Sequence, residues 1–163
     1  MAKRLENFVL EREHLQELLD SAFREEFQIL KEVDGAGGSP RALGICSKPS
    51  AILCSFVGRN TLEHVLEKMH YSDTQLLGLA LRLCIAVQEV HEKDFIHNDL
   101  MDDNIVVDVT TGRVSIIDYG NACRPGDNVG YGSSSADNIA PEILGGGPST
   151  SASDVFAVGF MLE

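Results

Sequence analysis

The sequence predicts an α+β fold, because helical and strand patterns both recur along its 163 residues. Residues 6–33 and 72–91 repeat apolar side chains at three- and four-residue steps, which is typical of amphipathic helices. Hydrophobic residues make up 44% of the chain, enough for a packed core. Four short runs of apolar, often β-branched residues are typical of strands, namely residues 42–46, 51–57, 105–107 and 114–117.

Turn and capping residues support this division. Residues 34–40, DGAGGSP, end the first helix because Gly and Pro interrupt a helical backbone. Thr61 is a candidate N-cap for a short helix to about residue 68, and Ser72 or Asp73 is a candidate for the long helix to about residue 91. On that long helix the expected buried stripe is Leu76, Leu77, Ala80, Leu83, Cys84, Val87 and Val90.

The composition is acidic, with 25 Asp and Glu residues against 13 Lys and Arg residues and a net charge of −12. Such a charge disfavours nucleic acid and anionic lipid as main partners. The four cysteines form no C-x-x-C pair, which favours free thiols in a reducing compartment. The first residues soon run into charge and the most apolar stretch, residues 76–90, is too short to cross a bilayer. We therefore expect a cytoplasmic protein without a signal peptide or membrane span.

The chemistry concentrates in residues 95–120, FIHNDLMDDNIVVDVTTGRVSIIDYG. Asp99, Asn104 and Asp118 flank two predicted strands, and a hairpin made of those strands would bring all three to one end. Magnesium prefers oxygen ligands and is usually held by one or two carboxylates together with substrate phosphates. One potential base and two potential magnesium ligands in one place indicate phosphoryl transfer.

At these residues the chain resembles the protein kinase family, whose motifs include H-R-D-L-x-x-x-N, D-F-G and A-P-E. The first motif appears at residues 97–104 as HNDLMDDN, the second at 118–120 as DYG, and the third at 140–142 as APE. Residues 153–159, SDVFAVG, resemble the start of a family helix that reads S-D-V-W-S-x-G. All four motifs stand in the family's order.

The resemblance implies a truncated, two-lobed kinase-like fold within one domain, residues 1–163. Residues 1–57 would be the remnant of the small lobe and the hinge, and residues 58–163 the first half of a helix-rich large lobe. A complete kinase domain is longer, so we expect a fragment with weak or no activity alone. ATP and Mg²⁺ are the implied cofactors, and a protein Ser, Thr or Tyr hydroxyl is the implied phosphate acceptor.

The same resemblance assigns the catalytic residues. Asp99 matches the catalytic base, and Asn104 and Asp118 match the magnesium ligands. Asp154 matches a buried family Asp that hydrogen-bonds the catalytic-loop backbone. His97 is expected to be a packed scaffold residue rather than a titrating catalyst.

The nucleotide contacts are implied in the same way. Glu26, with Glu25 as the alternative register, matches the helix glutamate that pairs with a strand lysine. Lys3 is the candidate for that lysine, because residues 1–5 resemble the end of the strand motif V-A-V-K-R-L. Ser55 and Val57 fall in the family's hinge, whose backbone groups bind adenine.

Two other functions remain open. Asn98 replaces the usual Arg of the first motif, as in small-molecule kinases of the choline or aminoglycoside type. Met101 stands where many kinases place a phosphate-contacting Lys, which favours a pseudokinase or binding module. The A-P-E motif and the helix near Ser153 favour a protein kinase instead.

Overall fold

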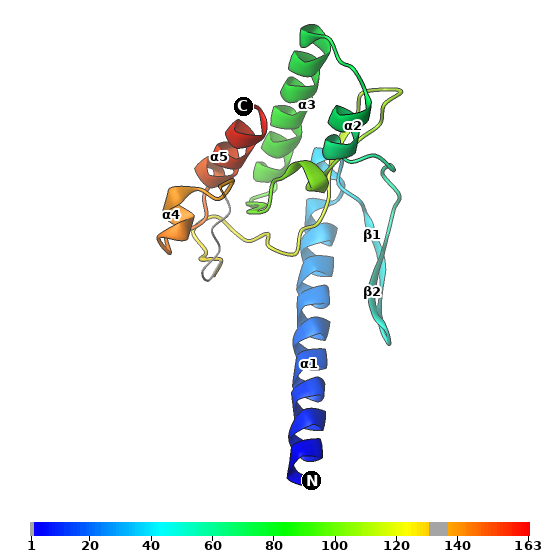
Figure 1. Cartoon of the computed structure of the whole chain (residues 1–163), viewed down its shortest axis with the longest axis vertical. Helices are drawn as coiled ribbons and strands as arrows, with labels where there is room; N and C mark the ends of the chain where they lie inside the picture. The colour runs from blue at the N-terminus through cyan, green and yellow to red at the C-terminus, as the bar shows by residue number, and fades with distance from the viewer. Residues whose placement is uncertain (1, 131–136) are drawn as a thin grey trace.

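The computed structural model describes the backbone of residues 2–130 and 137–163, and side chains from residue 14 onward. The stretch 121–139 is rich in Gly, Ser, Asn and Asp, which predicts a loop, and it lies partly outside the described residues. Helices and strands are both present, which confirms the α+β prediction (Figure 1). The elements are α1 (Ala2–Val33), 3-10 helix η1 (Ala36–Gly38), β1 (Ala42–Ser47), β2 (Ser50–Cys54), α2 (Leu62–Lys68), α3 (Asp73–His91), 3-10 helix η2 (Asp102–Asn104), β3 (Ile105–Val107), β4 (Val114–Ile116), α4 (Pro141–Leu144) and α5 (Ser151–Met161).

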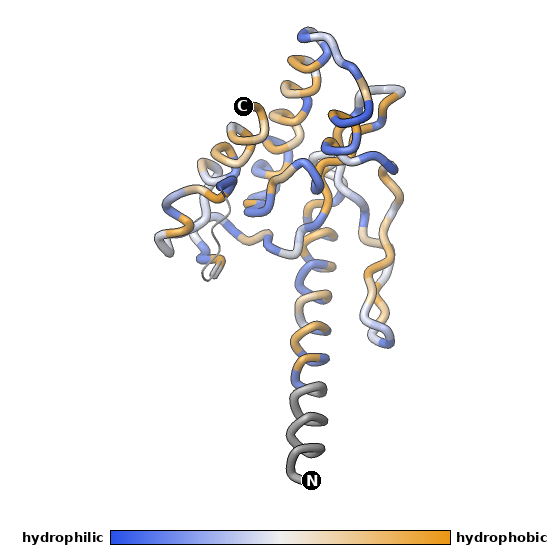
Figure 2. The backbone as a smooth tube through the Cα atoms, viewed as in Figure 1, coloured by the Kyte–Doolittle hydropathy of each residue, from blue (hydrophilic) through white to orange (hydrophobic). Residues whose placement is uncertain are grey.

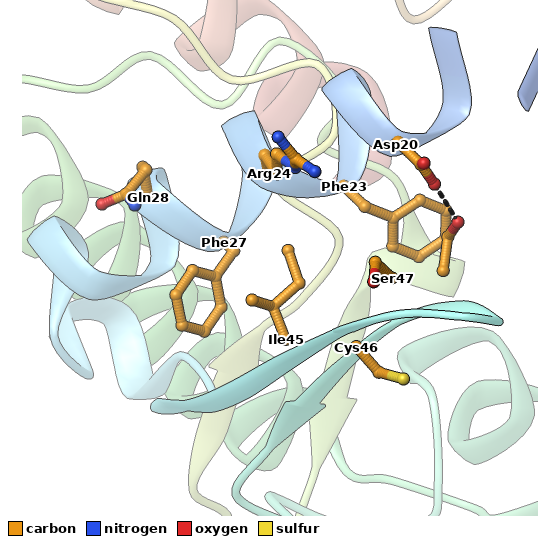
Figure 3. Close-up of a pocket in the computed structure, with 9 residues that line it drawn as sticks. Asp20, Phe23, Arg24, Phe27, Gln28, Ile45, Cys46 and Ser47 are labelled. Atoms are coloured by element: carbon orange, nitrogen blue, oxygen red, sulfur yellow. Dashed lines mark hydrogen bonds between the residues drawn. The ribbon is translucent and has the colours of Figure 1, made fainter. Parts of the chain in front are cut away.

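The antiparallel hairpin β1–β2 lies beside α1, whose N-terminal half extends away from the rest of the chain (Figure 1). Between the hairpin and α1 is a cavity of about 410 Å³. Phe23 and Phe27 point from α1 toward the hairpin, where Phe27 lies beside Ile45 (Figure 3). Asp20 hydrogen-bonds Ser50 across the gap. The cavity is lined by none of the residues that the sequence assigns to catalysis.

The second predicted strand was too long. The strand β2 ends at Cys54, and residues 55–57 leave the sheet. Ser55 marks the exit, because its N–H donates to the Arg41 carbonyl (2.9 Å) and its Oγ accepts from the Arg41 N–H (2.8 Å).

Both predicted N-caps are confirmed. Thr61 Oγ1 accepts from the His64 N–H at 3.3 Å, at the start of α2. Ser72 begins α3 with a capping box, in which its Oγ accepts from the Gln75 N–H and its own N–H donates to Gln75 Oε1. These two helices begin where local side-chain hydrogen bonds satisfy free N–H groups.

The core lies where α3 packs against η1, β4 and α5. Apolar residues alternate with polar ones along the tube in Figure 2, and several on α3 face outward. The predicted stripe of α3 was partly wrong: Leu77 is 71% exposed and Cys84 is exposed, whereas Leu79 and Ala86 are buried. α3 carries apolar residues on more than one face, so periodicity alone does not fix which face β4 and η1 cover.

The turn after α1 is wedged into this core. Gly37 and Gly38 both have positive φ, at 63° and 68°. A Cβ at Gly38 would lie 2.4 Å from the Val114 carbonyl oxygen, and one at Gly37 would lie 2.8 Å from the Ala86 carbonyl oxygen. The Gly37 N–H also donates to Glu89 on α3 at 2.8 Å. Only glycine therefore fits where η1 meets α3 and β4.

Gly38→Ala is expected to lower the free energy of unfolding by about 1–3 kcal/mol, because it adds a backbone clash to an unfavourable φ. Gly159→Ala is the matched control, since nothing lies within 4 Å of a Cβ at this helical position. The control is expected to raise the free energy of unfolding by about 0.5–1 kcal/mol. Urea denaturation followed by circular dichroism measures both. Equal effects of the two substitutions would contradict the close packing of Gly38 against β4.

Candidate functional site

A buried carboxylate fixes the loop that carries the predicted base. Asp154, on α5, is 1% exposed. Its Oδ2 accepts from the His97 N–H and its Oδ1 accepts from the Asn98 N–H, each at 2.8 Å. His91 Nε2 lies 2.8 Å from the same Oδ2. The predicted role of Asp154 as the anchor of the catalytic-loop backbone is confirmed.

His97 connects this loop to the end of β4. Its Nδ1 accepts from the Asp99 N–H (3.3 Å), so its Nε2 carries the proton and donates to the Ile117 carbonyl (3.1 Å). Burial lowers the pKa of His97, against the opposing effect of the Asp154 charge. Its ring meets Tyr119 edge-on, with centroids 4.8 Å apart. His97 is thus a neutral scaffold residue, as predicted.

Two side-chain amides hold the predicted base. Asn104 Nδ2 donates to the Asp99 carbonyl oxygen (2.9 Å) and lies 3.4 Å from Asp99 Oδ2. Asn121 Nδ2 donates to the same Oδ2 at 3.2 Å. Asn121 is a site residue that the sequence reasoning missed, and its position just after the D-Y-G motif was the available signal. Asp99 is half-buried, so its carboxylate is oriented yet accessible.

Asp118 lies at the same end of the β3–β4 hairpin as Asn104. Asn104 directly precedes β3, and Asp118 comes two residues after the end of β4. The Ile117 N–H donates to the Asn104 carbonyl at 2.9 Å. The Asp118 side chain is exposed and its Oδ1 accepts from the Gly120 N–H at 3.3 Å. Its φ of 63° is unusual for a residue with a side chain. The backbones of Asn104 and Asp118 therefore lie at one end of the hairpin, and the convergence of their side chains stays a prediction.

The donor chemistry at this end of the hairpin fits magnesium. The Asn104 amide nitrogen is used by Asp99, which leaves the amide oxygen as its ligand atom. Among the described side chains, no group of three or more His, Cys, Asp or Glu gathers as a metal cage. Magnesium does not need one, because it is commonly held by one or two carboxylates with water and substrate phosphates. The shared ion between Asn104 and Asp118 stays a prediction.

Glu26 reaches the site from α1. It is half-buried, and burial first and the Asp118 charge second raise its pKa, while a hydrogen bond from the Tyr119 backbone N–H opposes the rise. Glu25 is exposed. Glu26 is therefore the α1 carboxylate that faces Asp118, and the alternative register is not supported.

Lys3 does not belong to this site. It lies within α1, which begins at Ala2, and not on a strand. At 1.5 Å per residue, its backbone is about 35 Å from that of Glu26 along the helix axis. The predicted strand was wrong because Ala, Lys, Arg and Leu are strong helix formers, and no Gly or Pro separates them from the rest of α1.

The hinge prediction is compatible with the backbone geometry. The Ser55 N–H and Oγ are occupied by the backbone of Arg41, the residue directly before β1. Within the described part of the chain, the Ser55 carbonyl and the Val57 N–H make no backbone hydrogen bond. One acceptor and one donor are thus open for the edge of a base, and adenine binding here stays a prediction.

Asn98 ties the catalytic loop to the segment after Asp118. Its Nδ2 donates to the Asn121 carbonyl at 3.1 Å and lies 3.1 Å from Cys123 Sγ. Ile96 and Cys123 exchange two backbone hydrogen bonds of 2.9 Å beside it. The uncharged side chain of Asn98 therefore contacts residues 121–123 directly.

Glu26→Gln is expected to raise the free energy of unfolding at pH 7 and to leave it almost unchanged at pH 4. The folded-state pKa of Glu26 lies above its ordinary value of 4.5, so the folded protein binds this proton more tightly than the unfolded chain does. Ionised Glu26 therefore costs stability above its raised pKa, and the cost vanishes below about pH 4.5.

Urea denaturation at both pH values measures this difference, with Glu25→Gln as the exposed control that changes little at either pH. If Glu26→Gln stabilised the protein equally at pH 4 and pH 7, the raised pKa of Glu26 would be contradicted.

Comparisons with known proteins agree with this geometry. Residues 8–163 match the family model of the protein kinase domain. A probable serine/threonine-protein kinase of Corynebacterium efficiens, CE0033, is 29% identical over 161 residues, covering 88% of this chain and 24% of that protein. The serine/threonine-protein kinase shk2 of Schizosaccharomyces pombe is 22% identical over 114 residues, covering 68% of this chain and 19% of that protein. The chain spans about a quarter or less of the length of these relatives.

A solved structure supports the fold prediction. The kinase PK-1 of Cydia pomonella granulovirus superposes with a TM-score of 0.69 at 17% identity, over 84% of this chain and 52% of that one. This likeness confirms a partial kinase-like fold. The division at residues 57 and 58 into small-lobe and large-lobe parts stays a prediction. Since the family match spans nearly all of its length, the chain belongs to the protein kinase family.

Proposed function

We propose that this chain carries the catalytic centre of an ATP-dependent protein phosphotransferase. The proposal is supported by two observations: Asn104 contacts Asp99 directly, and the backbones of Asn104 and Asp118 lie at the same end of the β3–β4 hairpin. Phosphoryl transfer requires little covalent chemistry from the protein and depends on positioning and electrostatics. A base and two oxygen ligands on rigid neighbouring elements meet that requirement.

Each residue has a distinct role in the proposal. Asp99 accepts the proton of the substrate hydroxyl, and the amides of Asn104 and Asn121 fix the direction of its carboxylate. The Asn104 amide oxygen and the Asp118 carboxylate present ligands for magnesium. When bound, the ion neutralises charge on the transferred phosphate. The Ser55 carbonyl and the Val57 N–H bind the adenine edge.

The acceptor is a hydroxyl on a protein. The named relatives are serine/threonine kinases, which favours a Ser or Thr acceptor. The net charge of −12 disfavours nucleic acid as a partner. No helix in the described part of the chain has both the length and the apolar character to cross a membrane.

A second candidate is nucleotide binding without transfer. Among the described side chains, no Lys or Arg forms an ion pair with Glu26, and Lys3 is far away along α1. Kinases use such a lysine on the phosphates. Its absence from the described site favours weak turnover. The small-molecule kinase alternative has less support, since the family match is to protein kinases.

Measurement of ATP turnover together with Mg²⁺-dependent ATP binding tests the proposal, in the wild-type chain and in Asp99→Asn. The wild type is expected to bind ATP only with Mg²⁺ and to turn it over slowly. Asp99→Asn is expected to keep the binding and lose about 100-fold or more of the turnover, the usual contribution of a general base.

The possible results separate the two candidates. Binding without turnover in the wild type would identify a nucleotide-binding protein instead of an enzyme. Equal turnover in both proteins would remove Asp99 from the mechanism. Binding that is indifferent to Mg²⁺ would remove the metal role of Asn104 and Asp118.

A further inference from the structure

Tyr119, between the exposed residues Asp118 and Gly120, is fully buried at 0% exposure. Burial raises the pKa of its hydroxyl, which stays protonated and needs a hydrogen-bond partner. That partner is Ser39, 80 residues earlier in the chain. The D-F-G form of this motif has a Phe with no hydroxyl at this position, so the contact requires the Tyr that stands here instead.

The hydrogen bonds around Ser39 have one consistent direction. Ser39 Oγ donates its single proton to the Ala36 carbonyl, so toward Tyr119 it is the acceptor and the Tyr119 hydroxyl is the donor. The Ser39 N–H also donates to the Ala36 carbonyl, at 3.1 Å. Ser39 is 4% exposed and follows the wedged glycines of η1. The acceptor is therefore held rigidly by α3 and β4.

The Ser39–Tyr119 hydrogen bond bears on the backbone conformation of the adjacent residue, Asp118. Its φ of 63° is one that residues with side chains rarely adopt, and such a conformation persists only when its surroundings fix it. The Asp118 side chain itself is exposed, and within the described part of the chain its hydrogen bond is a long one, 3.3 Å from the Gly120 N–H. Both neighbours of Asp118 are held: Ile117 through its backbone bonds to Asn104 and His97, and Tyr119 through its burial and its contacts.

Tyr119 is held on three sides. Its ring packs edge-on against His97, its backbone N–H bonds Glu26, and its carbonyl accepts from the Ala122 N–H at 3.1 Å. The hydrogen bond from the Tyr119 hydroxyl to Ser39 adds a fourth contact, at the far end of the ring.

We propose that Ser39 is a positioning residue for Asp118, which it holds in place through the Tyr119 hydroxyl. The inference rests on the proposed function in one respect, because it gives the held carboxylate its use as a magnesium ligand. The hydrogen-bonded link itself is a property of the fold and can be tested without nucleotide.

Backbone amide hydrogen exchange tests the link in the wild type, Ser39→Ala, Tyr119→Phe and the double variant. Each single variant is expected to speed exchange at residues 118–120 about tenfold, as loss of one buried hydrogen bond predicts. Exchange in β3 should not change. The double variant should be no faster than the faster single variant, because both substitutions remove the same bond.

Ser149→Ala is the matched control. Ser149 is fully buried, and its hydroxyl has no hydrogen-bond partner among the described residues. In the Ser149→Ala variant, amide exchange at residues 118–120 should equal that of the wild type. Unchanged exchange in Ser39→Ala and Tyr119→Phe would overturn the proposal, and so would an increase spread equally over β3, which reports general loss of stability.

A second readout measures positioning itself. Both single variants are expected to raise the Mg²⁺ concentration at half-saturation of ATP binding severalfold, while Ser149→Ala leaves it unchanged. Faster local exchange with an unchanged Mg²⁺ midpoint would overturn the positioning role. Failure of the wild type to bind ATP with Mg²⁺ would overturn the proposed function instead, and the exchange data would still decide whether Ser39 holds the turn.

Discussion

The candidate site depends on one buried carboxylate, that of Asp154. Burying a charge is costly unless hydrogen bonds compensate it, and here two backbone N–H groups and His91 supply them. The backbone of residues 97 and 98 must therefore adopt one conformation, including the positive φ of 64° at Asn98. Asp99, the proposed base, follows directly, so the buried carboxylate of Asp154 fixes the backbone that carries it.

His97 connects the loop that Asp154 anchors to the segment at the end of β4. The His97 ring bonds both the Asp99 backbone and the Ile117 carbonyl, and it supports the Tyr119 ring. α1 is tied to the same region by Arg124, whose guanidinium lies 4.0 Å over the Phe95 ring and pairs with Glu32. Contacts thus connect α1, the β3–β4 hairpin and the loop of residues 97–99 around Asp118.

Local features of the sequence were predictable, and contacts between distant segments were not. The caps at Thr61 and Ser72 and the β3–β4 hairpin depend on neighbouring residues, so short patterns revealed them. The motif residues Asp99, Asn104 and Asp118 fall in one 20-residue stretch, and the hairpin brings them together. The Ser39–Tyr119 contact joins residues 80 apart and leaves no local pattern. The strand predicted at Lys3 was wrong because the helix-forming preference of residues 2–5 outweighs their short resemblance to a strand motif.

Paramagnetic broadening of amide NMR signals by Mn²⁺, in the presence of a non-hydrolysable ATP analogue, tests the central claim most directly. Mn²⁺ takes the oxygen ligands that Mg²⁺ prefers. The account predicts that signals from Asp99, Asn104 and residues 118–120 broaden first, and that Asp118→Asn greatly reduces the effect. First broadening over the exposed carboxylates Glu63 and Asp103, with residues 118–120 unaffected, would contradict it.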